Sequence, residues 1–257
     1  MGRGVTRFDA RRDATQRLYE YQCPTPALVN RPEGVALSLE QLKAVRITRQ
    51  ELEQVRAVLG VFEGPHDFHN FTADKCSDEA PTDTVRLVTK FTCLHTRVSP
   101  SSGIEYVALE VLGDSFIYHQ IRKMVGLAIF ALRYKPRAQQ VSFVKSVLHD
   151  KAERYVPLAP SVGLMLERVL FCKENKTHGG HTVLVDFSNV ANEIKAFKTQ
   201  RIYHEIDARE AAHRNTPTPN VQVPTPLPSA SSPCRVSLPL AAHAHRVVCL
   251  VVAGSVA

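Results

Sequence analysis

The sequence lacks the cysteine spacing of a zinc site or a disulfide framework. None of its six cysteines forms a C-x-x-C pair, and no regular interval separates them. Six cysteines in 257 residues are also too sparse for a disulfide-stapled scaffold. We therefore expect reduced thiols, several of them buried, and no metal site. The six are Cys23, Cys76, Cys93, Cys172, Cys234 and Cys249.

Long apolar runs are missing as well. The longest late run lies near Val247–Ala257, far shorter than the roughly 20 residues that a membrane-spanning helix needs. The first residues lead into charged ones and not into the apolar segment of a signal peptide. Arginines near the start are typical of a mitochondrial presequence, but Asp9 and Asp13 in the same stretch argue against one. We expect no association with a membrane.

Acidic residues are fewer than basic ones. Asp and Glu total 25 against 32 Lys and Arg, which gives a formal net charge of +7. A basic surface favours polyanionic partners such as nucleic acid. The hydrophobic share of 44% and charged share of 22% are typical of a globular chain and exclude disorder throughout.

The apolar pattern predicts alternating strands and helices. A strand is expected at 17–22, followed by a single helical stretch from Ser38 to Gly60 that begins with a Ser38–Gln41 capping box. The segment 67–72 is typical of a turn or short helix. Further expected elements are a hairpin of 85–93 and 107–111 around a turn at 99–103, helices at 115–133 and 141–148, strands at 164–171 and 182–187, and a helical stretch at 192–214.

This order indicates an α/β (α+β) fold with an antiparallel-dominated sheet and helices on one face. We divide the chain into a domain at 1–175, a helical extension at 176–214 and a tail at 215–257. The tail is rich in proline and has no acidic residue, so we expect it to be disordered.

The segment 113–126 carries the densest group of polar and aromatic side chains. On a helix, Tyr118, Arg122 and Gly126 would share one face, and His119 and Lys123 the neighbouring one. Such a helix could contact phosphate, although an ordinary solvated face explains the same spacing. Gly126 inside a helix indicates close packing.

Five motifs occur in a specific order: FDAR at 8–11, ATQRLYEY at 14–21, DFHNFT at 67–72, SFIYHQIRKMVG at 115–126 and GLML at 163–166. This series resembles the TruA-like tRNA pseudouridine synthase family, in particular its eukaryotic branch. The resemblance covers about residues 5–171, with a weaker echo at 194–210. It implies the C-terminal domain of the pseudouridine synthase fold.

The resemblance also implies an activity. Family members need no organic cofactor: they detach uracil from its ribose, rotate it and rejoin it through carbon five, after the base has left its stack. The matching positions make Tyr19 the residue that packs on uracil and Arg122 the partner of the nucleophilic Asp. Leu164 would line the base pocket.

Other positions are candidates for contact with RNA. Phe68, His69 and Asn70 suit unpaired bases, and a packed turn explains them equally well. His119 and Lys123 are expected to contact phosphate, with exposure to water as the alternative. The implied partner is tRNA, with other RNA possible, and the resemblance allows a homodimer in the nucleus or, alternatively, in the mitochondrion.

The family's nucleophile lies in an Arg-Thr-Asp motif followed by Gly-Val-His, which this sequence does not contain. The nearest match, Pro81-Thr82-Asp83, lacks the second part. We therefore expect a truncated form of an RNA pseudouridine synthase. The alternative is a non-catalytic RNA-binding protein derived from that family.

Overall fold

The computed structural model describes residues 9–11, 14–29, 37–72, 83–171, 177–178, 181–182 and 187–215. The proline-rich segment predicted to be disordered lies outside these ranges, except for its first residue. In the described part, no helix is long and apolar enough to cross a membrane.

A five-stranded antiparallel sheet forms the centre of the fold, in the order β2-β3-β4-β1-β5. The expected hairpin of 85–93 and 107–111 and the expected strand at 164–171 are confirmed. The sheet with its helices also confirms the predicted fold class. The strands are β1 (Ala14–Pro24), β2 (Gly64–Asp67), β3 (Val85–Val98), β4 (Glu105–Gly113) and β5 (Leu164–Phe171).

The strand β2 was not predicted, because it starts with Gly64-Pro65, a dipeptide that is typical of turns between elements. Gly64 has φ 104, a conformation that a residue with a side chain rarely adopts. β2 pairs only with β3 and is therefore an edge strand, where a proline without an N–H group is tolerated.

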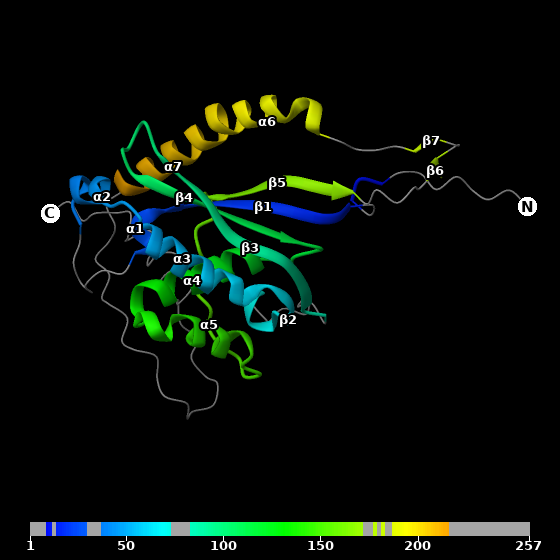
Figure 1. Ribbon diagram of the computed structural model, residues 1–257, viewed down its shortest axis with the longest axis horizontal. Helices are drawn as coiled ribbons and strands as arrows, with labels where there is room; N and C mark the ends of the chain where they lie inside the picture. The colour runs from blue at the N-terminus through cyan, green and yellow to red at the C-terminus, as the bar shows by residue number, and fades with distance from the viewer. Residues whose placement is uncertain are drawn as a thin grey trace, which may run out of the picture.

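Three helices cover one face of the sheet (Figure 1). They are α3 (Arg49–Leu59), α4 (Gln120–Tyr134) and α5 (Gln140–Leu148). Their apolar sides meet the inward side chains of β1, β3 and β4 in the main core, which includes Phe62, Phe91, Leu109 and Met124. The short α1 (Thr25–Leu28) follows β1 at one end of the sheet.

The single helix expected from Ser38 to Gly60 is in fact two. The predicted capping box is present: the Gln41 amide donates to Ser38 Oγ, and the Ser38 amide to Gln41 Oε1, and it starts α2 (Leu39–Ala44). A second capping box, between Thr48 and Glu51, starts α3. Extended backbone at Val45 and Thr48 separates the two helices, so continuous apolar spacing concealed a break.

The start of α4 also differs from the prediction. The expected start at Ser115 is wrong: the helix begins at Gln120, after His119 with φ 70. The Gln120 side chain accepts a hydrogen bond from the Ile117 amide at 2.9 Å, which fixes the preceding turn. Tyr118 therefore precedes the helix, and the face predicted to unite Tyr118, Arg122 and Gly126 does not exist as such.

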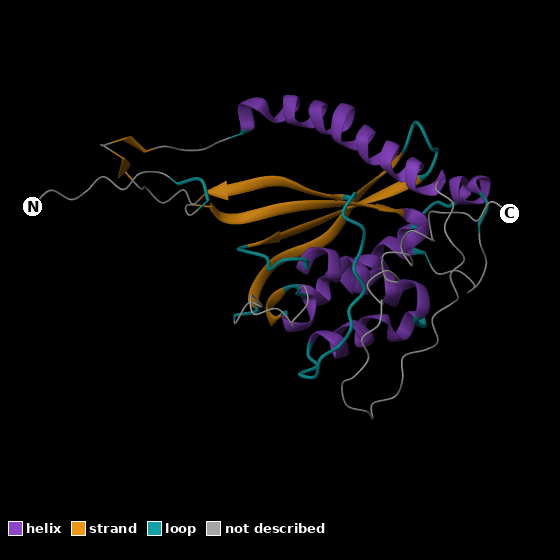
Figure 2. Ribbon diagram, turned by 180° about the vertical axis from the view of Figure 1, so that it is seen from behind, coloured by secondary structure: helices purple, strands orange, loops and turns teal. Residues whose placement is uncertain are grey.

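The opposite face of the sheet carries the predicted helical stretch (Figures 1 and 2). It consists of α6 (Ala191–Phe197), a π-helical turn η5 (Lys198–Ile202) and α7 (Tyr203–Asn215). In the chain, β6 (Thr177–His178) and β7 (His181–Thr182) come after β5 and before α6, and they pair with each other. The strand expected at 182–187 appears only at its first residue; 183–186 lie outside the described residues.

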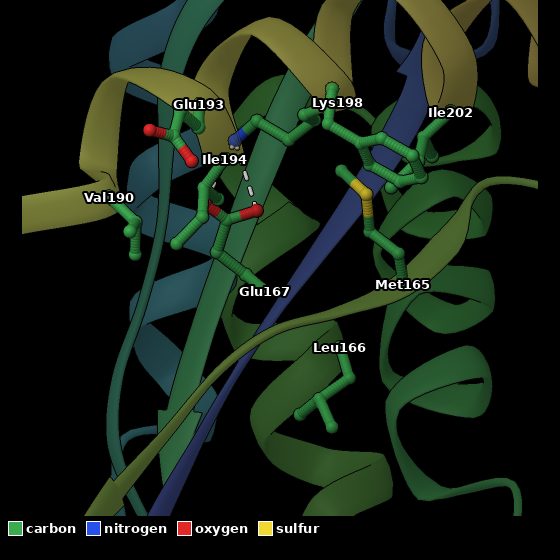
Figure 3. Close-up of a pocket in the computed structure, with 9 residues that line it drawn as sticks. Met165, Leu166, Glu167, Val190, Glu193, Ile194, Lys198 and Ile202 are labelled. Atoms are coloured by element: carbon green, nitrogen blue, oxygen red, sulfur yellow. Dashed lines mark hydrogen bonds and ion pairs between the residues drawn. The ribbon is translucent and has the colours of Figure 1, made fainter. Parts of the chain in front are cut away.

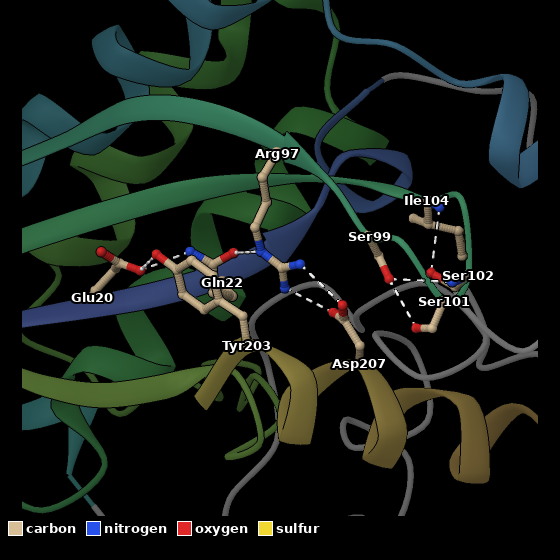
Figure 4. Close-up of polar contacts among 9 residues, drawn as sticks. All are labelled: Glu20, Gln22, Arg97, Ser99, Ser101, Ser102, Ile104, Tyr203 and Asp207. Atoms are coloured by element: carbon tan, nitrogen blue, oxygen red, sulfur yellow. Dashed lines mark hydrogen bonds and ion pairs between the residues drawn. The ribbon is translucent and has the colours of Figure 1, made fainter. Parts of the chain in front are cut away.

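Buried polar groups fasten this helical segment to the sheet (Figure 4). Arg97 of β3 makes two hydrogen bonds to Asp207 of α7, at 2.8 and 3.1 Å, and a third to Gln22 of β1 at 2.8 Å. The Tyr203 hydroxyl donates to Glu20 at 2.7 Å. These contacts join segments up to 183 positions apart in the chain.

Candidate active site

The loop between α5 and β5 ties α4 to β1. Ala159 accepts a hydrogen bond from Arg122 Nε at 2.7 Å and donates its own amide to the Arg122 carbonyl at 3.1 Å. The Tyr21 hydroxyl donates to the Pro160 carbonyl at 3.0 Å. Arg122, on the first turn of α4, is thus held against the strand that carries Tyr19.

Close packing makes this junction possible. A Cβ on Gly126 would collide with the carbonyl oxygen of Pro157, and one on Gly163 would lie 2.5 Å from the Gln22 carbonyl oxygen. The prediction that Gly126 marks a close approach is confirmed. Glycine at both positions lets the loop reach α4 and β1.

Tyr19 is half-buried on the helix-covered face of the sheet. Its ring meets the edge of Phe116, with centroids 5.5 Å apart and planes at 87°. Its partner across the ladder in β5 is Leu166, which is 51% exposed. Leu164, two residues earlier in β5, is partly buried and packs on the core.

The Arg122 guanidinium is partly buried. Burial lowers its pKa from the ordinary value, and the nearby Tyr21 and Tyr118 oppose that shift. Within the described ranges no acidic side chain pairs with Arg122, and its side-chain hydrogen bond engages Nε. The two Nη groups therefore suit an incoming carboxylate, which a guanidinium binds with two parallel hydrogen bonds.

The segment 68–72 is a packed turn next to α4. The expected short helix is present as η2 (His69–Phe71). Phe68 is fully buried, with its ring 5.5 Å from that of Phe71. The Asn70 side chain donates to Ala152 at 3.1 Å and accepts from the Arg154 amide at 3.0 Å. Both side chains have a structural role here.

Lys123 supports the same turn, since its Nζ donates to the Asn70 carbonyl at 3.3 Å and to that of Thr72. His69 Nδ1 lies 3.3 Å from a carboxylate oxygen of Asp67. Contact of Phe68, His69, Asn70 and Lys123 with RNA stays a prediction. The packing of Phe68 and Asn70 does not support it.

Asp83, the nearest match to the missing nucleophile, does not lie on the strand that carries Tyr19. It precedes β3, accepts the Val85 amide at 3.0 Å, and lies 3.6 Å from Arg86. β4 separates β3 from β1.

A groove of 330 Å³ between β5 and the helical segment was not predicted (Figure 3). Lys198 contacts Glu20 and Glu167 there, each at 3.0 Å. Burial lowers the Lys198 pKa, but the hydrogen bonds and charges of the two carboxylates outweigh it and raise that pKa. No short-range signal in the sequence relates Lys198 to residues 31 and 178 positions away.

The comparisons with known proteins point to one family. Residues 58–171 match the model of the family described as tRNA pseudouridine synthase. This part of the chain is thus similar to the tRNA pseudouridine synthase family. The match includes Arg122 and Leu164 from the predicted site.

Similarity to individual relatives extends further. The mouse protein named pseudouridylate synthase 1 homolog is 34% identical over 211 residues, which cover 81% of this chain and 47% of the relative. The human protein of that name is 33% identical over 212 residues, 81% and 46% of the two chains. A Yarrowia lipolytica protein named tRNA pseudouridine synthase 1 is 34% identical over 185 residues, 68% and 34%. The chain thus spans about half the length of the mammalian relatives that it matches.

Proposed function

We propose that this chain takes part in converting uridine to pseudouridine in tRNA, as one half of a pseudouridine synthase. In this isomerisation the bond from the ribose carbon to N1 of uracil breaks, and a bond to C5 forms. The C5 proton leaves, and N1 takes up a proton, so that the atoms balance. The proposal rests on the placement of Arg122, which the 159–163 loop holds against the strand that carries Tyr19.

Arg122 is suited to hold the nucleophilic carboxylate. A guanidinium beside a carboxylate keeps it ionised and fixes its direction, which a nucleophile requires. Arg122 is itself fixed by Ala159, so it needs little reordering when the carboxylate arrives. Tyr19 offers a ring against which an unstacked uracil can pack. The aspartate would come from outside the described residues.

A chimera tests the proposal. Residues 14–171 replace the matching part of the mouse relative, and tritium release is measured from tRNA labelled at C5 of uridine. We expect release, and a loss of at least about 100-fold in Arg122→Ala, because the nucleophile loses the group that fixes its direction. The control is Arg209→Ala, at an exposed position, which should release tritium as the unchanged chimera does. Because Arg209 lies beyond residue 171, this control uses a chimera that carries residues 14–215.

Two outcomes would contradict the proposal. One is a folded chimera that binds tRNA and releases no tritium while the mouse parent does. The other is equal release from the Arg122→Ala chimera. The chain alone is expected to release none; release abolished by Tyr19→Phe would show that a carboxylate within this sequence serves as nucleophile.

Binding to RNA can be measured separately. The net charge of +7 predicts that affinity for tRNA falls as salt rises, because basic groups release counterions on binding. Binding that is weak at low salt and insensitive to salt would contradict an RNA partner. Competition by other structured RNAs would show whether the substrate class extends beyond tRNA.

Location and assembly are further parts of the proposal. The resemblance supports a nuclear protein, and imaging of a fluorescently tagged chain against nuclear and mitochondrial markers tests this. It also supports a homodimer, for which sedimentation of the purified chain at several concentrations is the test. A monomer at all concentrations would remove that part alone.

A further inference from the structure

Tyr118 is the most exposed large apolar or aromatic side chain that the structure describes. Its exposed fraction is 72%, above the 60% of Phe197 and the 56% of Val85. One face of the ring is covered by the ring of His119, with centroids 3.9 Å apart and planes at 24°. The opposite face of Tyr118 therefore presents an aromatic surface to solvent.

The backbone is specialised to form this stacked pair. His119 has φ 70, and it is the one non-glycine residue with positive φ in the described ranges. Left-handed backbone is unfavourable for a residue with a Cβ and persists where the surroundings impose it. Consecutive side chains in a strand point to opposite faces, so the turn at His119 is what brings the two rings together.

The pair lies beside the candidate active site. Tyr118 is close enough to Arg122 to influence its pKa. Two residues before it, Phe116 contacts the ring of Tyr19. An RNA whose uridine reached Tyr19 and Arg122 would bring its neighbouring nucleotides past Tyr118.

We propose that Tyr118, backed by His119, is a stacking platform for an unpaired base of the RNA that flanks the target uridine. This inference rests on the proposed function and adds a substrate contact to it. A base withdrawn from a helix has an uncovered face, and an exposed tyrosine ring covers it without a charged contact. The pair is already ordered, so little freedom is lost on binding.

The absence of tryptophan from the whole chain provides a direct test. Tyr118→Trp introduces a single indole, whose fluorescence is quenched when a base stacks on it. We expect quenching on titration with single-stranded oligouridylate and with tRNA, and little with a blunt RNA duplex. The control is Leu39→Trp. Leu39 is 46% exposed and belongs to α2, which lies at the end of the sheet opposite to the start of β1 (Figure 1).

Affinity measured with the full chain gives the second readout. Tyr118→Ala is expected to weaken binding of single-stranded RNA on the order of tenfold, and Tyr118→Phe to leave it unchanged. The salt dependence should be the same in both variants, since no ionic contact is lost. Because Tyr118 is exposed, neither variant should lose stability, which circular dichroism checks.

Equal affinity of Tyr118→Ala and wild type, or unquenched Tyr118→Trp in saturated complexes, would overturn the inference. Weakening that also reduced the salt slope would overturn it too, because it would indicate an ionic contact. Wild-type protein that bound no RNA would refute both this inference and the proposed function. Stacking in a chimera that released no tritium would refute the proposed function alone.

Discussion

Asp207→Ala tests how the helical segment is held on the sheet. The Asp207 side chain is 4% exposed, and both of its oxygens accept hydrogen bonds from Arg97, which is itself 14% exposed. The guanidinium also lies 4.6 Å from the ring centre of Tyr106 and 4.5 Å from that of Tyr203. Removal of the carboxylate leaves a charge between two rings with two N–H directions unsatisfied.

Breaking one side of such a buried pair costs about 3–5 kcal/mol. Release of α7 from the sheet would let water reach Arg97, so we expect the loss near the lower end, about 3 kcal/mol. Detachment of α7 is then favoured about 150-fold more than in wild type. Hydrogen exchange of the α7 amides should accelerate by a similar factor, while amides of α4 change less.

The control is Arg209→Ala in the same helix. Its ion pair with Glu205 is exposed, 63% and 59% for the two side chains, and surface pairs of this kind contribute about 0–1 kcal/mol. Urea unfolding gives the free energies, and hydrogen exchange gives the local effect. Equal losses in the two variants would refute the reasoning. The double variant Arg97→Met/Asp207→Leu should be less destabilised than Asp207→Ala, because no charge is left unpaired.

Two further perturbations follow from the packing and the charges. Gly126→Ala should lower stability by about 1–3 kcal/mol, because its Cβ would collide with Pro157. Gly60→Ala should raise stability by up to about 1 kcal/mol, because nothing lies near its Cβ position. A higher melting temperature for Gly126→Ala than for wild type would contradict this. The Lys198 pKa is raised in the folded state, so its contribution is present at neutral pH and is lost as the pH rises above its ordinary value of 10.5. Urea unfolding between pH 7 and 12 should show a larger loss in wild type than in Lys198→Met, in which the raised pKa of Tyr203 still contributes.

Local signals in the sequence determined most of the secondary structure. Alternation predicted β1, the β3–β4 hairpin and β5, because a strand with one buried face has a period of two residues. The Ser38–Gln41 capping box marked the start of α2 because the motif closes within four residues. A glycine at position 126 of the helical pattern predicted close packing, and Pro157 is the neighbour that requires it. The order of the motifs indicated the same family as the comparisons.

Tertiary structure decided what depends on distant residues. Apolar spacing continues across 45–48, so the pattern hid the break that the second capping box creates. Serine is a common N-cap, which favoured a helix start at Ser115. The hydrogen bond from the Ile117 amide to the Gln120 side chain and the left-handed backbone of His119 instead place the start at Gln120. Tyr118 therefore precedes the helix, and its ring stacks on that of His119. The contacts of Lys198 and Arg97 span up to 178 residues, and only the folded sheet brings their partners together, because no local pattern encodes pairing at that range.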